Sequence, residues 1–412
     1  MTLHPERAND QDQQPTMNQA KAMTTSEQII GHCQSLFDDL EFTAARNWKD
    51  AEPGRKVIAF MPIYVPREII HAAGMLPLGV FGGGDQLEVI QGDAYFQSYI
   101  CRIPRSTIEL VLTGRLDFVD GMLFPSICDV IRNLSGMLKL IRPEMYSHYF
   151  DVPQNYEDGV GGEFYTRELR DLCKGLEKLS GREITDEALR NSIEVFNENR
   201  RLVNRFYELR AKYPWRVPAA EAYLLMRAGM LMPVEEHNQL LLNYMTIAEK
   251  TERPQRDNCR VVVTGMFCEQ PPLNLIKSIE LAGCYVIDDD FMLVNRWLTE
   301  DVPLEGDPLH NLSMAFIHHS AKTSATYEPN EEEKGLYLVD AVRRSDAEGV
   351  IFAAPSFCDP ALLERPMLQD ALNAANIPYI SFKYAENSGQ MQPIREQAGT
   401  FADSIKLWGA EA

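Results

Sequence analysis

Short apolar runs alternate with amphipathic stretches in two separate parts of the chain. In the first part, "KVIAFMP" at residues 56–62 predicts a buried strand, "REIIHAAG" has helical spacing with a closing glycine, and "MLPLGVF" predicts the next strand. In the second part, residues 260–291 contain "RVVVTGMF", "PPLNLIKSIELAG" and "CYVIDDDF". These predict a strand, a helix with proline near its start and glycine at its end, and a strand. The same order of elements therefore occurs twice.

Each part then continues with one more apolar run, a turn, an amphipathic stretch and a last strand. The apolar runs are "GMLF" and "GVIFAA", the amphipathic stretches are "VIRNLSGMLKLI" and "PALLERPMLQDALNAANI", and the last strands are "MYSHYFDV" and "PYISFK". Alternating strands and helices are typical of a parallel α/β sheet. The sequence thus predicts an α/β protein with two doubly wound, Rossmann- or flavodoxin-like parallel-sheet domains, which repeat in pattern more than in identity.

Between these parts, residues 166 to about 252 give almost no strand signal. Stretches such as "TDEALRNSIEVFNENRRLVNRFYELRAKY" are charged and amphipathic, which predicts a helical insert. The stretch 300–336 is predicted to be a polar excursion. The predicted regions are a flexible tail over residues 1–23, an N-terminal α/β domain over 24–165 with Cys101 and Cys128, a helical domain over 166–255, and a C-terminal α/β domain over 256–412 with Cys358.

Composition excludes several classes of protein. The 412 residues are 45% hydrophobic, as in globular proteins. The formal net charge of -20 argues against binding to nucleic acid or to anionic membranes. No run is long enough for a membrane span, and the polar N-terminus lacks the apolar core of a signal peptide. We therefore expect a cytoplasmic protein, whose eight cysteines are packing residues or ligands rather than disulfides.

The turn Pro-Ser-x-Cys-Asp occurs once in each sheet-forming part, in "FPSICDV" with Cys128 and in "APSFCDP" with Cys358. Ligands of open parallel sheets bind beyond the carboxyl ends of the strands, where both turns are predicted to lie. Asp129 and Asp359 fit the N-cap of a helix, and Pro360 fits its first position. A helix N-terminus lowers the pKa of a nearby thiol, which predicts cysteines prepared to ligate or react.

A single strand-end cysteine is more often a small apolar filler, but recurrence of the turn favours function. Cys101, in "QSYICRIPRST", also precedes an amphipathic helix. Three converging thiolates suit zinc or an iron–sulfur cluster. Structural zinc sites usually use close pairs such as C-x2-C, which this sequence lacks. The dispersed cysteines therefore favour an iron–sulfur cluster held between domains. Such a cluster would have one iron without a cysteine ligand. The other cysteines are predicted to be packing residues: Cys33, Cys173, Cys259, Cys268 and Cys284.

Weaker signals have two interpretations each. "GGGD" at residues 82–85 could approach a phosphate or form a tight turn, and the absence of G-x-G-x-x-G and of a P-loop argues against ATP or NAD binding by those modes. His318 and His319 could be a base or metal ligands, or neither. Four basic residues could hold coenzyme A phosphates or be ordinary surface charges: Arg102, Arg105, Arg132 and Lys139.

Cys101, "FPSICDVIRNLSG" and "PSFCDP" together resemble the 2-hydroxyacyl-CoA dehydratase superfamily, over most of residues 24–412. The stretch "MPIYVPREIIHAAGMLPLGVFGGGDQLEVIQGDAYFQSYICRIPRSTIEL" is similar to the benzoyl-CoA reductase branch, and there to the smaller of its two cluster-bearing subunits. Dehydratases of the superfamily usually carry Thr-Arg before a C-terminal Ala-Phe. Here Ile394 precedes Arg395, a departure that weighs against simple dehydratase activity.

This resemblance implies a [4Fe–4S] cluster on Cys101, Cys128 and Cys358, with the fourth iron facing the substrate. It implies the cluster-bearing catalytic subunit of an ATP-dependent, ferredoxin-linked benzoyl-CoA reductase. That enzyme is an oxidoreductase of anaerobic aromatic degradation that dearomatises benzoyl-CoA to a cyclohexadiene carbonyl-CoA. The implied partners are a sister cluster-bearing B subunit, the ATP-binding A and D subunits, and ferredoxin as the electron donor of the hetero-oligomer.

Two other functions remain open. The chain could belong to a 2-hydroxyacyl-CoA dehydratase, which shares the cluster site but removes water. It could also be a non-catalytic Fe–S electron-relay or scaffold subunit. If the ring of benzoyl-CoA lies near the cluster, an apolar wall is needed. "GMLPLGVFGGG" and the aromatic residues Tyr95, Phe96 and Tyr99 could form that wall or pack in the core.

Overall fold

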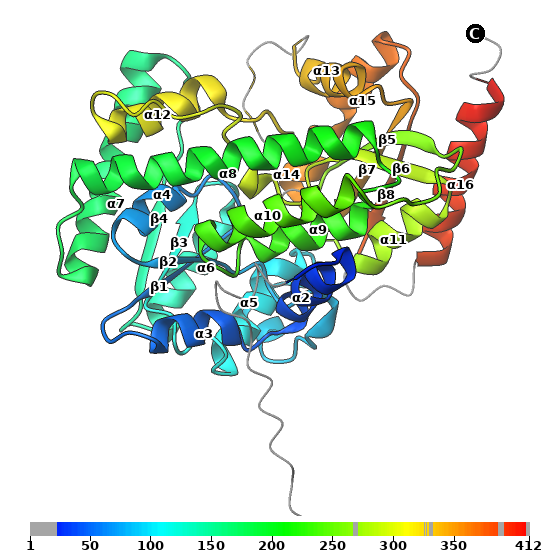
Figure 1. Cartoon of the computed structure of the whole chain (residues 1–412). Coiled ribbons are helices and arrows are strands. Elements are labelled where there is room, and N and C mark those ends of the chain that lie inside the picture. Colours follow the sequence, from blue (N-terminus) through cyan, green and yellow to red (C-terminus); the bar gives the residue numbers. More distant parts are fainter. Residues whose placement is uncertain are drawn as a thin grey trace, which may run out of the picture.

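The computed structural model describes residues 23–266, 271–324, 326, 328, 333–385 and 391–408. Residues 1–22 of the predicted tail, and Cys268, lie outside these ranges. Figure 1 shows the two sheets side by side, with the long helix α8 (Asp186–Lys212) lying across both. We call residues 24–165 the first half and residues 256–412 the second half.

The first sheet consists of four parallel strands in the order β2-β1-β3-β4. The strands are β1 (Val57–Phe60), β2 (Leu76–Gly79), β3 (Gly121–Pro125) and β4 (Tyr146–Phe150). The first three are buried along their whole length, which explains why the sequence shows continuous apolar runs rather than alternation. Placing β3 beside β1 reverses the direction of strand addition and gives a flavodoxin-like order.

The second sheet repeats this arrangement as β6-β5-β7-β8, again with all strands parallel. Its strands are β5 (Cys259–Thr264), β6 (Cys284–Asp289), β7 (Gly349–Pro355) and β8 (Tyr379–Tyr384). The predicted fold, two doubly wound parallel sheets with flanking helices, is confirmed. The match in strand order also supports the interpretation of the two halves as repeats of one pattern.

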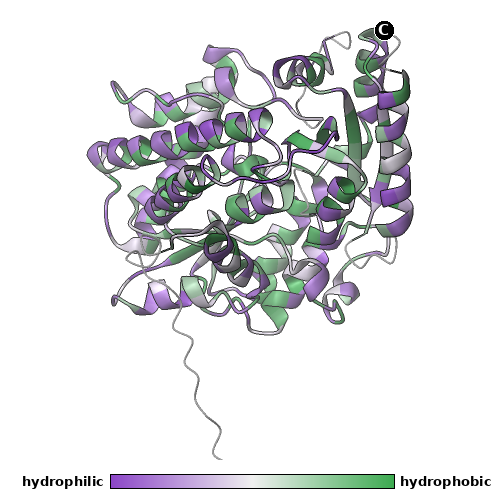
Figure 2. Cartoon of the chain, turned by 45° about the vertical axis from the view of Figure 1, so that its right-hand side comes forward, coloured by the Kyte–Doolittle hydropathy of each residue, from purple (hydrophilic) through white to green (hydrophobic). Residues whose placement is uncertain are grey.

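Helices cover both sheets. In the first half these are α2 (Ser26–Asp38), α3 (Thr43–Asp50), α4 (Arg67–Ala72), α5 (Arg102–Leu112) and α6 (Asp129–Ile141). In the second half they are α11 (Leu273–Leu281), α12 (Pro308–His319), α13 (Leu336–Ser345), α14 (Asp359–Leu362), α15 (Arg365–Ala374) and α16 (Met391–Trp408). Figure 2 shows hydrophilic residues on the outward faces of the helices and hydrophobic residues on the strands.

The predicted polar excursion at 300–336 contains helix α12. Asp307 caps this helix by accepting hydrogen bonds from two backbone amides, and proline occupies the first turn. Leu312 and Phe316 are buried, and the helix packs against α7 (Glu163–Ser180). The segment is therefore partly a structured element, because its apolar residues have a partner helix that its polar composition did not reveal.

The helical stretch between the halves comprises α7, α8, α9 (Ala219–Ala228) and α10 (Val234–Ala248). Helix α8 forms buried ion pairs with both halves. Arg200 lies 2.5 Å from Glu68 of α4, and Arg210 lies 2.5 Å from Asp289 of β6. Breaking such a buried pair on one side is strongly destabilising, so these contacts fix both halves on one helix. The division into three domains with boundaries at 165 and 255 stays a prediction.

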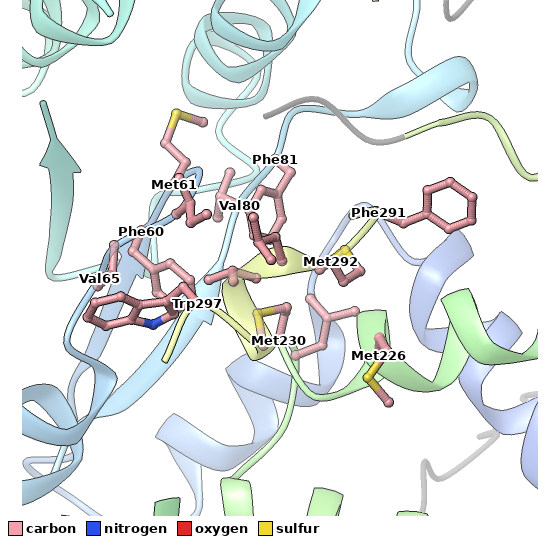
Figure 3. Close-up of a cluster of buried hydrophobic side chains, with 14 of the residues drawn as sticks. Phe60, Met61, Val65, Val80, Phe81, Met226, Met230, Phe291, Met292 and Trp297 are labelled. Atoms are coloured by element: carbon pink, nitrogen blue, oxygen red, sulfur yellow. The ribbon is translucent and has the colours of Figure 1, made fainter. Parts of the chain in front are cut away.

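One apolar core runs through both halves and the helical region. Figure 3 shows its middle, where Phe60 and Phe81 of the first half approach Met230 after α9 and Met292 and Trp297 of the second half. A smaller core lies on the other face of the second sheet, under α13 and α15. No helix in the described ranges has the length and apolar character needed to cross a membrane.

Candidate functional site

A cavity of about 390 Å³ lies between the halves, at the carboxyl ends of strands β1, β3 and β7. Its size is within the roughly 300–1,000 Å³ of small-molecule and cofactor sites. Cys101, Cys128 and Cys358 all line it. We call it the cysteine cavity. The structure thus brings together the three predicted ligands, and it does so where open parallel sheets place ligands.

The first Pro-Ser-x-Cys-Asp turn, residues 125–129, is fixed to the end of β4. The amide of Ser126 donates to the carbonyl of Phe150 at 3.0 Å, and the Ser126 hydroxyl accepts from the amide of Val152 at 2.8 Å. The backbone of Cys128 is extended, and α6 begins at the next residue. The two serine contacts therefore set where the Cys128 side chain enters the cavity.

The second turn, residues 355–359, is fixed in the same way to the end of β8. The amide of Ser356 donates to the carbonyl of Tyr384 at 2.8 Å, and its hydroxyl donates to the same carbonyl at 3.0 Å. Phe357 has a positive φ of 68°, which side-chain-bearing residues seldom adopt. Cys358 comes next, as the residue before α14, and is 3% exposed.

Cys101 stands immediately before α5, so all three cysteines occupy the N-cap position of a helix. The prediction that Asp129 and Asp359 are N-caps is wrong, because both are already the first helical residues. Pro360 is accordingly the second helical residue rather than the first. A carboxylate in the first turn of a helix is still favourable beside the helix dipole. The two aspartates therefore did indicate the start of a helix, but the N-cap lies one residue earlier, at the cysteine.

The pKa of the Cys128 thiol is raised, contrary to the lowering that a helix N-terminus suggests. Burial is the main cause, and it outweighs the backbone amides of Ile131 and Val130, which lower the pKa. The nearby Cys358 raises it further. A buried thiol of this kind is a poor nucleophile, whereas a bound metal deprotonates a coordinating thiol outright. The site is therefore better suited to ligation than to thiol chemistry.

The donor set of the cavity consists of three cysteine thiols. Among the described residues, no three His, Cys, Asp or Glu side chains lie close enough to hold one metal ion. Three cysteines line the same cavity. Soft thiolates are the usual ligands of iron–sulfur clusters. Cys101, Cys128 and Cys358 could thus hold such a cluster, with Asp129, Asp359 and Glu364 also on the cavity wall.

The four basic residues near the turns do not line this cavity. Arg102 donates to the carbonyl of Leu87 at 2.5 Å, Arg105 lies 3.3 Å from Asp93, and Arg132 lies over the ring of Tyr149. Lys139 is in the last turn of α6. The contacts of the three arginines favour the surface-charge interpretation over phosphate binding.

The predicted aromatic wall also lies elsewhere. Tyr95 and Tyr99 are 42% and 63% exposed, and neither they nor Phe96 line the cavity. The apolar lining comes instead from residues on four separate segments: Pro62, Ile103, Ile127 and Leu363. The residues before Cys101 were thus the wrong choice: Ile103, two residues after Cys101, lines the cavity, and the rest of the wall comes from other parts of the chain.

Several of the weaker signals resolve to structural roles. A Cβ on Gly82 would lie 2.1 Å from the Ser106 hydroxyl, and Gly82 has a φ of 77°, so "GGGD" is a tight turn. His318 and His319 pair on the surface with Asp158 and Glu300. The packing interpretation is confirmed by burial for four cysteines, while Cys268 is outside the described residues: Cys33, Cys173, Cys259 and Cys284.

Two features of the site were missed from the sequence. Glu364 lines the cavity and lies two residues after the end of α14. It forms an ion pair with Lys334, which is 5% exposed. Nothing in the spacing of Lys334 and Glu364 indicates that they meet.

Ile394, where the sequence departs from the dehydratase pattern, is buried in α16 and does not line the cavity.

The family model described as 2-hydroxyglutaryl-CoA dehydratase, D-component, matches residues 62–405, a range that includes all three cysteines. The chain belongs to this family. The C subunit of benzoyl-CoA reductase from Thauera aromatica is 69% identical to it, over 94% of the chain and 100% of the relative.

More distant relatives are dehydratase subunits. The (R)-phenyllactyl-CoA dehydratase beta subunit of Clostridium sporogenes is 28% identical, over 86% of the chain and 93% of the relative. The beta subunit of (R)-2-hydroxyglutaryl-CoA dehydratase from Acidaminococcus fermentans is 29% identical, over 85% of the chain and 93% of the relative. The family therefore includes subunits named for two kinds of reaction.

Proposed function

We propose that this chain is the cluster-bearing catalytic subunit of an ATP-dependent, ferredoxin-linked benzoyl-CoA reductase. The observation that carries the proposal is the position of Cys101, Cys128 and Cys358, each before a helix and all around one cavity between the halves. The 69% identity to one subunit of that enzyme supports the choice of reaction over others of the family.

In this proposal the three cysteines hold a [4Fe–4S] cluster. The cluster supplies one-electron transfer, and the protein supplies binding, orientation and exclusion of water. Pro62, Ile103 and Leu363 present apolar surface to the cavity. An aromatic ring placed against that surface is kept from water, which protects a radical formed by single-electron reduction. Dearomatisation to a cyclohexadiene carbonyl-CoA then requires two electrons and two protons.

The proposed partners are a sister cluster-bearing B subunit, the ATP-binding A and D subunits, and ferredoxin. Phe357 and Leu363, beside the cavity, are 53% and 73% exposed. Apolar side chains at the edge of a site suit coverage by another chain, and we assign that role to the sister subunit. The sequence contains no phosphate-binding loop, so ATP hydrolysis is expected only with the ATP-binding subunits. We place the complex in the cytoplasm.

The decisive experiment is anaerobic purification of the complex, followed by iron and sulfide analysis and an assay with benzoyl-CoA, ATP and a strong reductant. The proposal expects iron in this subunit and formation of a dienoyl-CoA product. A complex that contains iron but leaves benzoyl-CoA unchanged would contradict the reaction, and an iron-free subunit would contradict the cofactor.

The second candidate function is that of a 2-hydroxyacyl-CoA dehydratase subunit, which the dehydratase relatives at 28% and 29% identity favour. It predicts dehydration of a 2-hydroxyacyl-CoA in the same assay. A non-catalytic relay or scaffold subunit predicts instead that the cluster of this chain is reduced and reoxidised during turnover while substrate binds only to the partner. Photocrosslinking with a benzoyl-CoA analogue separates that case from the first two.

A further inference from the structure

The lining of the cysteine cavity has an excess of negative charge. Three carboxylates line it, and among the described residues no lysine, arginine or histidine does: Asp129, Asp359 and Glu364. Glu364 has a counter-charge, because it forms an ion pair with Lys334. The excess charge of the lining therefore lies on the two aspartates that follow Cys128 and Cys358.

These two aspartates are not the residues that hold the turns. The turns are fixed to the neighbouring strands through Ser126 and Ser356. Within the part of the chain that the structure describes, Asp129 and Asp359 form no ion pair. Arg132 acts on Asp129 at longer range, and its guanidinium lies over the ring of Tyr149. Both carboxylates thus keep their charge beside the cavity.

The charge is placed by the repeated fold and is unevenly distributed around the three thiols. Asp129 is the first residue of α6, and Asp359 is the first residue of α14. The residue after Cys101 is Arg102, which donates to the carbonyl of Leu87 and does not line the cavity. Each half therefore adds one carboxylate next to one cysteine by the same route, and the third cysteine has none.

The charge of Asp129 acts on the thiol beside it. Burial is the main cause of the raised pKa of Cys128, and the carboxylate of Asp129 adds a smaller electrostatic contribution in the same direction. A negative charge that disfavours a thiolate also disfavours an electron added to a cofactor bound through that sulfur, because both increase the negative charge at one place. The reduction potential of an iron–sulfur cluster depends on such charges.

We propose that Asp129 and Asp359 lower the reduction potential of the cluster in the cysteine cavity. The inference rests on the proposed cofactor. A lower potential makes the reduced cluster a stronger one-electron donor, which the reduction of an aromatic ring requires. Both aspartates are exposed, so solvent and salt weaken their effect, and each one changes the redox equilibrium only a few-fold.

The test uses the full-length chain, reconstituted anaerobically with iron and sulfide. Its midpoint potential is measured by EPR during titration with a europium(II) reductant. Asp129→Asn and Asp359→Asn, alone and together, remove the charge with little change in shape, whereas Asp129→Glu keeps it. Asp186→Asn is the matched control, because Asp186 is also an exposed first residue of a helix but does not line the cavity.

Each single substitution to Asn is expected to raise the ratio of reduced to oxidised cluster at a fixed potential about threefold. The double substitution is expected to raise it about tenfold, an upward shift of about 59 mV for a one-electron couple. Asp129→Glu and Asp186→Asn are expected to match the wild type. The shift is expected to shrink at high salt, as an effect of packing would not. A loaded double variant with the wild-type potential would overturn the inference.

If the Asn variants do not retain the cluster, the charge is changed instead at Leu363, which lines the cavity and is 73% exposed. Relative to Leu363→Gln, Leu363→Glu is expected to lower the potential and Leu363→Lys to raise it, and equal potentials would overturn the inference. The failures of the two proposals are distinguishable. A wild-type chain that binds no iron contradicts the cofactor and the charge effect together, whereas a loaded chain whose potential ignores these charges contradicts the charge effect alone.

Discussion

The two Pro-Ser-x-Cys-Asp turns share a backbone scheme and differ in the helix that each one starts. In both, a serine amide donates to the carbonyl of the last residue of the neighbouring strand, Phe150 in the first half and Tyr384 in the second. After Cys128 the chain continues into the 13-residue helix α6, but after Cys358 it forms only the four-residue α14. The repeated part is therefore the strand end, not the helix.

This difference shows which features the repeated fold fixes and which it leaves to local sequence. The strand order β2-β1-β3-β4, matched by β6-β5-β7-β8, places both cysteines at equivalent carboxyl ends. The short α14 leaves Leu363 and Glu364 outside a long helix and on the cavity lining. Each half thus contributes a sulfur by the same route, while the second half contributes more of the wall.

The largest expected effect is the loss of the cluster. If the cysteines of the two turns are equivalent ligands, Cys128→Ala and Cys358→Ala cause this loss to the same extent. Each is expected to abolish the cluster of this subunit and the activity of the complex, because a cluster with two remaining cysteines is not retained. Iron analysis of the anaerobically purified complex measures this, and Cys101→Ala is expected to behave alike.

The control is Cys33→Ala, since Cys33 is buried in α2 and does not line the cavity. Its iron content is expected to equal that of the wild type. Full iron loading in the Cys128→Ala protein would remove the first turn from the ligand set and break the equivalence of the halves.

The sequence was sufficient to predict the features that depend on local pattern. The apolar runs indicated the strands, and the repeated turn pointed to Cys128 and Cys358, which the structure places in one cavity with Cys101. It failed where partners are distant. The burial of the Cys128 thiol, which raises its pKa, depends on packing between halves and outweighs the local helix N-terminus.

Helix α12 and the Lys334–Glu364 pair illustrate the same limit. The apolar face of α12 is recognisable only once α7 is beside it. Lys334 and Glu364 are each ordinary charged residues in sequence, and only the fold pairs the buried Lys334 with the partly exposed Glu364. The predicted aromatic residues precede Cys101 and do not line the cavity, whereas Ile103 after it does, and the sequence did not indicate which side of the cysteine faces the cavity.

A carboxylate holds the loop after β5, and this provides a pH-dependent test in the second half. Asp290 accepts from the Thr264 hydroxyl at 3.0 Å, from the Gly265 amide at 2.7 Å and from the Met266 amide at 3.0 Å. Burial raises the pKa of Asp290 to about 6, from an ordinary value of 3.8. The folded state therefore binds this proton more tightly than the unfolded state does.

The contribution of Asp290 to the free energy of unfolding is expected to decrease as the pH rises from about 4 to about 6. The full pKa shift of Asp290 corresponds to a decrease of at most about 3 kcal/mol. Because Asp290 is partly exposed, the measured decrease is expected to be smaller than this limit. Urea unfolding of the wild type and of Asp290→Asn between pH 4 and 7 measures the difference. The control is Asp340→Asn, at an exposed residue that lines, with Asp290, a cavity of about 340 Å³ at the end of β6. Parallel pH profiles for wild type and Asp290→Asn would contradict the prediction.

The two serines provide a smaller and more direct comparison of the turns. Ser126→Ala leaves the amide of Val152 without its acceptor, and is expected to lower the free energy of unfolding by about 1–2 kcal/mol. Ser356→Ala costs only about 0.5–1 kcal/mol, because the carbonyl of Tyr384 keeps the bond from the Ser356 amide. Urea unfolding at one pH measures both, and equal losses would show that the serine hydroxyls have the same role in the two halves.

The last comparison concerns the residue before each cysteine, where the two turns are expected to differ in the sign of the stability change. Phe357 is 53% exposed and has a φ of 68°, a conformation that costs a side-chain-bearing residue roughly 1–2 kcal/mol. Phe357→Gly removes that cost, and the ring that it gives up also lines the cavity but is more than half exposed, so the variant is expected to stabilise the protein by up to about 1 kcal/mol. Ile127 has no positive φ and lines the cavity.

Ile127→Gly therefore loses apolar contact and gains backbone freedom in the unfolded state, and is expected to destabilise by about 1–2 kcal/mol. Thermal unfolding of the two variants gives the signs directly. A stabilising Ile127→Gly would mean that the first turn is strained as well. A destabilising Phe357→Gly would mean that the contacts of the Phe357 ring stabilise the protein by more than its backbone conformation costs. That result is expected if a neighbouring chain packs over the ring, so the isolated chain and the complex are both measured. Stabilisation in the isolated chain that disappears in the complex would place the second turn, and not the first, at the interface with a partner.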